Sequence, residues 1–216
     1  MRYAVTGATG FLGANLVRKL LEQGHEVVAL IRKPNELVEG LPIQLLPVSL
    51  TGNSAEERNA LRKALAGCDG VFHVAGIFDP SPGGAERMHQ VHVQATERLC
   101  EAARDAGVPR IVLCSSSITV GFGSIDSPGD EDTSYDPEQT YGSVGALRAY
   151  HDTKLASERL LLSQTDIDGV VVNPDFILGP WDVKPTSGQL IVTMGQRWVP
   201  FYPAGGKCFQ SAGDCA

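Results

Sequence analysis

The sequence predicts an α/β fold in which a doubly wound parallel sheet is covered by helices on both faces. Short apolar runs alternate with helix-length amphipathic segments along most of the 216 residues, which is the rhythm of consecutive βαβ units. Several of the apolar runs are continuous rather than alternating with polar residues, a pattern that strands buried on both faces have. With 43% hydrophobic residues, the chain can bury one sizeable core.

The first half contains four predicted strands and two predicted helices. Each predicted strand is a short apolar run, and each predicted helix repeats its apolar residues at helical spacing. The strands are "YAVTG", "HEVVALI", "LLPVSL" and "GVFHVAG", and the helices cover residues 11–23 and 54–66.

The second half begins with a long helical pattern over 85–106. It ends at Gly107-Val108-Pro109, because glycine followed by proline stops a helix. The strand "RIVLCSS" comes next. Residues 117–140 are rich in Gly, Pro, Ser and Asp, so we expect a solvated surface loop there.

The alternation closes with a helix over 144–163 and the strand-like "GVVVNPDFILGP". From Gly179 onward the chain has more proline and glycine, with one short helical pattern at 187–198. We therefore predict one domain over 1–178 and the beginning of a second, smaller lobe over 179–216.

The overall charge limits the partners. A net charge of −7 and a pI near 5.2 argue against nucleic acid or an anionic membrane, since neither polyanion gains from an acidic surface. No apolar run has membrane-spanning length and no signal peptide precedes the first strand, so we expect a cytoplasmic protein. The scattered cysteines have no metal-ligand spacing, and we expect reduced packing residues. They are Cys68, Cys100, Cys114, Cys208 and Cys215.

A glycine-rich turn joins the first strand to the first helix. In "TGATGFLG", Gly7, Gly10 and Gly13 stand three residues apart. Glycines at such a turn let the backbone approach a pyrophosphate, and the helix N-terminus presents free N–H groups to the anion. This context predicts a dinucleotide-binding domain of the Rossmann type, although the spacing is G-x-x-G-x-x-G.

The end of the second strand bears on the choice of dinucleotide. A carboxylate there would bind the ribose 2′-hydroxyl of NAD, whereas a basic residue would accept the 2′-phosphate of NADP. The segment "VVALIRKP" offers Arg32 and Lys33 and no acid. We therefore predict NADP, with NAD as the alternative.

Tyr150 and Lys154, in "YHDTK", lie four residues apart in the predicted helix over 144–163. Positions i and i+4 share a helix face, so the phenol and the ammonium can share one small volume. A phenol can donate a proton to a carbonyl oxygen while a nicotinamide delivers hydride to its carbon, and a nearby cation is expected to lower the phenol pKa. Hydroxyl groups that end "RIVLCSS" can hold the carbonyl oxygen.

Five motifs, in this order, resemble the extended short-chain dehydrogenase/reductase family, which includes nucleotide-sugar epimerases, dehydratases and dihydroflavonol-reductase-like carbonyl reductases. They are "TGATGFLG", "GVFHVAG", "GVPRIVLCSSS", "YHDTKLASE" and "NPDFILGP", and they extend over nearly the whole chain. The resemblance implies a homodimer, with Val91, Leu99 and Leu160 as contacts. Simple packing of these residues on the sheet is the alternative.

The resemblance also implies roles for single residues. Tyr150 would be the general acid/base, Lys154 would bind the nicotinamide ribose, and Ser116 would orient the substrate carbonyl, with Ser117 as the second choice within Ser115–Ser117. Substrate would also meet Ser117 and Phe78, and Trp181 and Tyr202 are further candidates for an apolar wall. The implied cofactor contacts are Gly7, Thr9, Gly10, Phe11, Leu12, Gly13, Arg32, Leu50, Val74, Ala75, Gly76, Tyr150, Lys154 and Pro174.

The chain departs from the family pattern at several places. Ser49 stands where Asp is usual, and His92 replaces the Asn of the long helix. His92 either supports the active-site geometry or is a packed or surface histidine, and the sequence leaves both open. We expect His73 to be a core histidine with a satisfied hydrogen bond. Family members usually continue for about a hundred residues more, so we expect a truncated chain or a fragment with exposed apolar surface.

Three functions fit these observations. The first is an NADP-dependent reductase of a carbonyl on a small molecule. The second is an NAD-dependent nucleotide-sugar epimerase or dehydratase, of which the epimerase is favoured because "SSSITVGFG" has no acid beside its serines. The third is a non-catalytic dinucleotide sensor, which the Tyr150–Lys154 pair disfavours.

Overall fold

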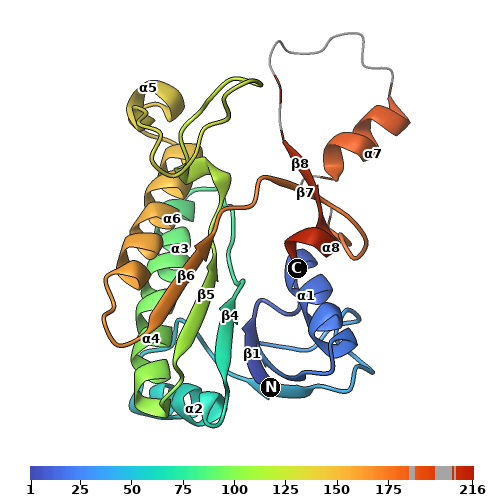
Figure 1. Ribbon diagram of the computed structural model, residues 1–216, viewed down its shortest axis with the longest axis vertical. Coiled ribbons are helices and arrows are strands. Elements are labelled where there is room, and N and C mark those ends of the chain that lie inside the picture. Colours follow the sequence, from blue (N-terminus) through green and yellow to red (C-terminus); the bar gives the residue numbers. More distant parts are fainter. Residues whose placement is uncertain (185–187, 198–205, 207) are drawn as a thin grey trace.

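The computed structural model contains a six-stranded parallel sheet in the order β3-β2-β1-β4-β5-β6 (Figure 1). It describes residues 1–184, 188–197, 206 and 208–216. The chain moves outward from β1 to β3 and then crosses back to β4, so the strand order reverses between β1 and β4. The predicted doubly wound, Rossmann-type fold is confirmed. The strands are β1 (Arg2–Thr6), β2 (Glu26–Ile31), β3 (Gln44–Pro47), β4 (Gly70–His73), β5 (Arg110–Cys114) and β6 (Asp168–Val172).

Helices lie on both faces of the sheet (Figure 1). One face carries α1 (Phe11–Glu22), and the other carries α2 (Ala55–Leu65), α4 (Ala95–Ala106) and α6 (Ala146–Leu162). The predicted helix over 85–106 is one continuous rod in three parts, in which α3 (Gly84–His89) passes through a π-helical turn, η1 (Gln90–Gln94), into α4. It ends at Gly107, whose φ of 72° suits glycine.

The two faces are not covered equally. A continuous core lies between the sheet and the helices α2, α4 and α6. In this core Leu65, Leu99, Ile111 and Leu161 are fully buried. On the α1 face, by contrast, Val172 of β6 is 40% exposed. A cavity of about 160 Å³, lined by apolar side chains of α1, β4, β5 and β6, lies there. Helices cover both faces, as predicted, but α1 leaves β5 and β6 partly open.

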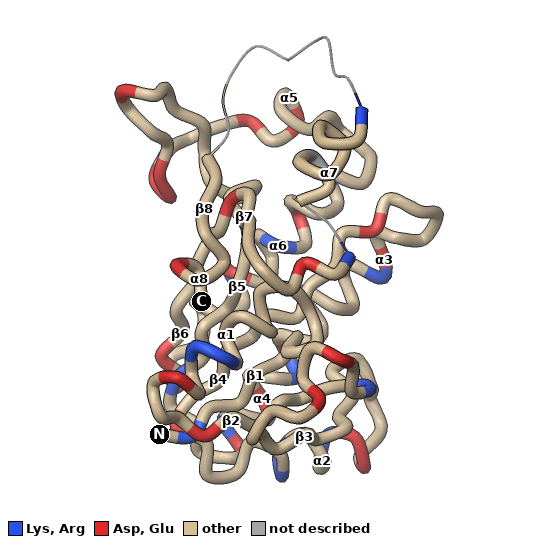
Figure 2. The backbone as a smooth tube through the Cα atoms, turned by 90° about the vertical axis from the view of Figure 1, so that its right-hand side faces the viewer, with Lys and Arg blue, Asp and Glu red and all other residues tan. Residues whose placement is uncertain are grey.

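Charged residues of the sheet stand at one end of it (Figure 2). Within the six strands, the charged residues are Arg2, Glu26, Arg110 and Asp168, each the first residue of its strand. Arg110 and Asp168 form an ion pair across β5 and β6. The last residues of the six strands are therefore free of Asp, Glu, Lys and Arg, and ligands of open α/β sheets bind at this end.

The predicted second lobe and the three residues before it contain a separate pair of strands. The predicted strand "GVVVNPDFILGP" is divided, and β7 (Phe176–Leu178) pairs in parallel with β8 (Phe209–Ser211). The lobe also holds α7 (Gln189–Gln196) and α8 (Ala212–Cys215), and α8 packs against α1. The domain division after Leu178 stays a prediction.

Several smaller expectations can be compared with the described residues. The five cysteines are free; Cys68 and Cys100 lie in the core, but Cys208 is exposed and is not a packing residue. The loop over 117–140 is largely exposed, as predicted, and contains the short helices η2 (Ser117–Thr119) and α5 (Pro137–Tyr141). Among the described residues, no helix is both long and apolar enough to span a bilayer. Tyr202 lies outside the described residues.

Candidate active site

The glycine turn forms a narrow cradle between β1 and α1. Gly7 has a φ of 71°, and a Cβ on it would lie 2.7 Å from the Ala75 nitrogen. A Cβ on Gly13 would lie 2.1 Å from the Gly7 carbonyl oxygen. Both positions therefore require glycine. Gly10 precedes α1 without any side-chain cap, and the first turn of α1 has no acidic residue, so its N–H groups are available to an anion.

Two side chains fasten neighbouring segments to this cradle. Thr6 Oγ1 accepts the Ala75 N–H at 3.1 Å, which sets Val74, Ala75 and Gly76 beside the glycine turn. Asn35 Nδ2 donates to the Thr9 carbonyl at 3.0 Å and ties down the segment that follows β2. Arg32 is exposed at the start of that segment. These contacts hold the segments after β2 and β4 beside the glycine turn, and sequence reasoning missed both Thr6 and Asn35.

Leu50 and Pro174 lie at two other points of the same sheet edge. Leu50 is half-buried after β3, and its carbonyl accepts a hydrogen bond from Arg98 at 3.4 Å. The Pro174 carbonyl accepts the Ser117 N–H at 2.9 Å, which joins the segment after β6 to the serine turn after β5.

Lys154 reaches from α6 under the carboxyl end of β5. Its Nζ donates to the Cys114 carbonyl at 3.0 Å, and the side chain is buried. Burial lowers the pKa of this lysine. A Cβ on Gly76 would lie 3.1 Å from Nζ, so the absence of a side chain at Gly76 leaves room for the ammonium group.

Tyr150 lies one turn before Lys154, with Nζ 5.9 Å from the centre of its ring. The Ser116 side chain lies close enough to the phenol to influence its pKa. Burial raises the pKa of Tyr150, and the nearby Ser116 hydroxyl lowers it by less. The sequence-based expectation that Lys154 lowers this pKa is not met, because the ammonium group is directed at the Cys114 carbonyl and burial dominates.

The three consecutive serines have different surroundings. Ser115 is buried and donates to Glu158. Ser116 turns toward Tyr150, and its Oγ also accepts the Ile118 N–H at 3.3 Å. Ser117 begins η2. Of the three, Ser116 is the one whose hydroxyl meets the phenol.

Glu158 holds the serine turn in place. Its Oε1 accepts a hydrogen bond from the Ser115 hydroxyl. The same oxygen accepts hydrogen bonds from Thr119 Oγ1 at 2.7 Å and from Asn173 Nδ2 at 2.8 Å. These donors come from the segments after β5 and β6, so one carboxylate joins α6 to both. Sequence reasoning missed Glu158, although its position four residues after Lys154 places it on the same helix face.

His92 lies in the π-helical turn and contacts the other side of Tyr150. Its Nε2 accepts the Ile77 N–H at 3.1 Å, so Nδ1 carries the proton and donates to Thr153 Oγ1 at 2.9 Å. The imidazole meets the Tyr150 ring edge-on at 5.6 Å. Burial, with Lys154 nearby, lowers the pKa of His92 to about 3. The structure thus shows a buried neutral histidine beside the phenol.

His73 continues this network below the site. Its Nδ1 accepts from Thr6 Oγ1 at 2.7 Å, and its Nε2 donates to Thr96 Oγ1 at 3.2 Å, because Thr96 gives its own proton to the His92 carbonyl. The side chain is fully buried, which lowers its pKa to about 3. The predicted core histidine with a satisfied hydrogen bond is confirmed.

Aromatic side chains border the site unevenly. Phe78 is half-exposed and meets the Tyr150 ring edge-on at 5.5 Å. Trp181 instead stacks under Arg18 of α1 at 3.9 Å. Of the three expected dimer contacts, Leu99 is fully buried within this chain and cannot touch a second copy. The homodimer itself stays a prediction.

Fold and site together define a Rossmann-type nucleotide-binding protein with a Ser-Tyr-Lys cluster beside its glycine turn. Residues 3–198 match the sequence model of the NAD dependent epimerase/dehydratase family. The chain belongs to this family, in agreement with its resemblance to the extended short-chain dehydrogenases/reductases.

Three similar proteins illustrate the relationship. The chain is 35% identical over 206 residues to a putative dihydroflavonol 4-reductase from Synechocystis sp., covering 93% of this chain and 56% of the relative. It is 33% identical over 190 residues to a 3 beta-hydroxysteroid dehydrogenase/Delta 5-->4-isomerase from Mycobacterium tuberculosis. This match covers 84% of this chain and 48% of the relative. The crystal structure of gox2253 superposes with a TM-score of 0.82 at 30% identity. The superposition covers 99% of this chain and 63% of gox2253. The chain thus spans about half the length of these curated relatives.

Proposed function

We propose that the chain forms the coenzyme-binding and catalytic part of an NADP-dependent reductase that acts on a carbonyl group of a small molecule. The observation that supports this most is the meeting of Ser116, Tyr150 and Lys154 at the carboxyl edge of the sheet, next to the glycine cradle. A proton donor, a hydrogen-bonding hydroxyl and a fixed cation are what carbonyl reduction needs.

Each of the three side chains has a separate task in this proposal. Tyr150 donates the proton to the carbonyl oxygen, and its raised pKa keeps the phenol protonated at neutral pH. Ser116 orients that oxygen through its hydroxyl. Lys154 holds the nicotinamide ribose. A bound nicotinamide supplies the hydride.

The coenzyme seat in this proposal is mostly backbone. Gly7, Thr9, Gly10, Phe11, Leu12 and Gly13 surround the pyrophosphate, with the free N–H groups of α1 as donors. Val74–Gly76 and Leu50 line the nucleoside, and Pro174 borders the nicotinamide. Arg32, exposed just after β2, pairs with the 2′-phosphate of NADP.

The substrate in this proposal is an apolar, ring-containing carbonyl compound. The half-exposed ring of Phe78 offers an apolar wall next to Tyr150, and Ser117, which follows Ser116, is the second proposed substrate contact. The two curated relatives are named for reactions on dihydroflavonols and steroids, which are compounds of this kind.

A second candidate is an NAD-dependent nucleotide-sugar epimerase, and the family description favours it. The same Ser116, Tyr150 and Lys154 would serve it. An epimerase regains its hydride within one turnover and need not release its coenzyme, whereas a reductase must exchange it.

The test is a fluorescence titration of the purified chain with NADPH and NADH. We expect NADPH to bind more tightly, and Arg32→Ala to weaken NADPH by about tenfold to a hundredfold through loss of a charge-assisted contact, leaving NADH unchanged. Lys19→Ala is the matched control, because Lys19 is exposed in the last turn of α1, far from the glycine turn.

Other outcomes contradict the proposal. Preference for NADH, or coenzyme that copurifies and does not exchange, would favour the epimerase. Binding of coenzyme without turnover of any ketone or aldehyde would favour a sensor.

A further inference from the structure

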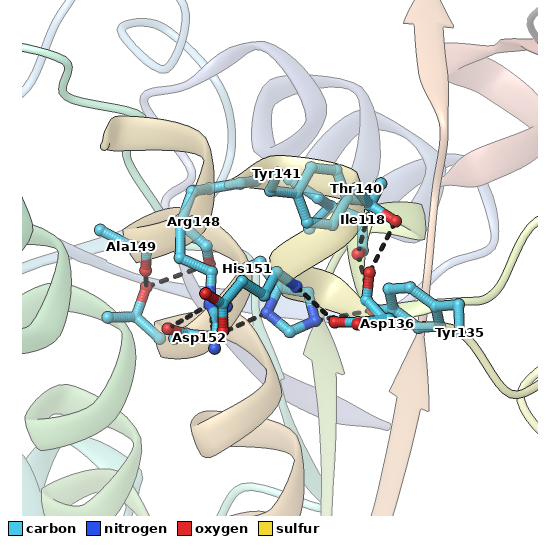
Figure 3. Close-up of polar contacts among 12 residues, drawn as sticks. Ile118, Tyr135, Asp136, Thr140, Tyr141, Arg148, Ala149, His151 and Asp152 are labelled. Carbon is cyan, nitrogen blue, oxygen red and sulfur yellow. Dashed lines mark hydrogen bonds and ion pairs between the residues drawn. The ribbon is translucent and has the colours of Figure 1, made fainter. Parts of the chain in front are cut away.

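The loop between β5 and α6 is attached to α6 at His151 (Figure 3). His151 directly follows Tyr150 and is 1% exposed. Its Nε2 lies 2.6 Å from Tyr135 Oη, and its Nδ1 lies 2.8 Å from Asp152 Oδ1. One imidazole therefore bridges a phenol of the loop and a carboxylate of the helix.

Ring contacts enclose the same imidazole. The Tyr135 ring meets it edge-on at 5.8 Å, and the Tyr141 ring lies at 5.5 Å with a tilt of 35°. Phe122 packs its ring against both tyrosines. Two tyrosines that are six residues apart in a mostly exposed loop thus converge on one buried side chain of α6.

Charged and polar neighbours contact both nitrogens of the His151 ring. Arg148 Nε donates to both oxygens of Asp152, at 2.9 and 2.8 Å. Burial raises the pKa of Asp152, but its bonds with His151 and Arg148 outweigh this and lower it. Burial raises the pKa of Tyr135 to about 12. An ionised Asp152 therefore accepts from Nδ1–H, and the protonated Tyr135 has its hydroxyl within hydrogen-bond distance of both Nε2 and the Ile118 carbonyl.

The attachment continues to Ser116 through Ile118. The Ile118 carbonyl accepts from Tyr141 Oη at 3.1 Å and lies equally close to Tyr135 Oη, while the Ile118 N–H donates to Ser116 Oγ. Tyr135 has one hydroxyl proton and stands between Ile118 and His151. Movement of the loop away from α6 would therefore release contacts two residues from Ser116.

We propose that His151 is a positioning residue, which latches residues 120–145 onto α6 and thereby fixes the turn that carries Ser116. The kinetic consequence rests on the proposed reductase function, since Ser116 is there the group that orients the substrate. The latch itself is a property of the free chain and is measurable without a substrate.

The test is amide hydrogen exchange, followed by mass spectrometry, on the wild type, His151→Phe and Tyr135→Phe. Phenylalanine keeps a ring in place but loses the hydrogen bond, which is worth about 1 kcal/mol, or about fivefold in an equilibrium. We expect residues 120–145 to exchange about fivefold faster in each variant, and the double variant to exchange no faster than either single one. His89→Phe is the control, because His89 is exposed on α3.

Kinetics provide the second readout. In both variants the KM for the carbonyl substrate should rise about fivefold while NADPH affinity changes less, because most of the proposed coenzyme seat, the glycine turn and Val74–Gly76, lies on other elements.

Two results would overturn the latch. One is unchanged exchange of residues 120–145 in both variants, and the other is a uniform increase over the whole chain, which would make His151 an ordinary core residue. If the wild type reduces no carbonyl but the loop still exchanges faster in the variants, the latch stands and the proposed function fails.

Discussion

The two faces of the sheet carry different halves of the candidate site. On the face of α2, α4 and α6, the core is closed, and buried side chains such as Lys154 and His92 lie in fixed hydrogen bonds. On the α1 face, β6 is partly open, and the site consists of backbone in the glycine turn. Val172 on one face and Leu99 on the other show the contrast, at 40% and 0% exposure.

This difference shows what each half of the site needs. A proton donor with a shifted pKa needs burial and a defined neighbour, and only close packing supplies both. A phosphate cradle needs free N–H groups and space for the ligand, which glycine and a helix N-terminus supply locally. The α1 face can therefore hold a coenzyme seat without complete packing beside it.

The largest expected effect separates the two halves by activity. Tyr150→Phe removes only the hydroxyl on the packed face, so the rate of carbonyl reduction should fall by about 10²–10⁴-fold with NADPH binding within about twofold of wild type. Gly13→Val on the α1 face should abolish NADPH binding, because its Cβ would lie 2.1 Å from the Gly7 carbonyl oxygen. Steady-state kinetics and fluorescence titration measure the two effects.

Circular dichroism of both variants serves as the control for folding. Full activity of Tyr150→Phe would show that the phenol is not the proton donor. Tight NADPH binding by Gly13→Val would show that the glycine turn does not bind the coenzyme.

The next effect compares the faces by stability. Leu99→Ala should lower the free energy of unfolding by about 2–5 kcal/mol, because it opens a cavity in the closed core. Val172→Ala should cost less than about 1 kcal/mol, since this side chain is already partly in water. Urea unfolding followed by circular dichroism measures both, and equal losses would mean that the α1 face is as well packed as the other.

The third effect concerns the two neutral histidines of the packed face. His73 and His92 have pKa values of about 3, against about 6.5 in an unfolded chain. Between these values the unfolded state binds more protons, so the free energy of unfolding falls as the pH drops from about 6.5 toward 3. Each histidine contributes at most about 1.4 kcal/mol per pH unit.

Urea unfolding at several pH values between 7 and 4 tests this dependence. His92→Asn should reduce the slope of the free energy of unfolding against pH by the contribution of one histidine. His89→Gln, at an exposed position, should leave this slope unchanged. Carboxylates contribute equally to all three proteins, so the differences isolate His92. An unchanged slope in His92→Asn would show that His92 is not held neutral.

The sequence by itself determined the features that depend on neighbours along the chain. A strand followed by glycines and a helix fixed the cradle of Gly7, Gly10 and Gly13, and helical periodicity fixed the shared face of Tyr150 and Lys154. Both are local consequences of backbone geometry.

Only the tertiary structure decided which side chains complete the site. The resemblance already favoured Ser116, but only the structure shows that Glu158, 43 residues after Ser115, accepts the Ser115 hydroxyl while Ser116 lies near Tyr150. His92 meets Thr153 across 61 residues, and Tyr135 meets His151 from a loop whose composition predicts only solvent exposure. Such partners depend on how helices and loops pack against the sheet. The spacing of residues along one segment does not predict that packing.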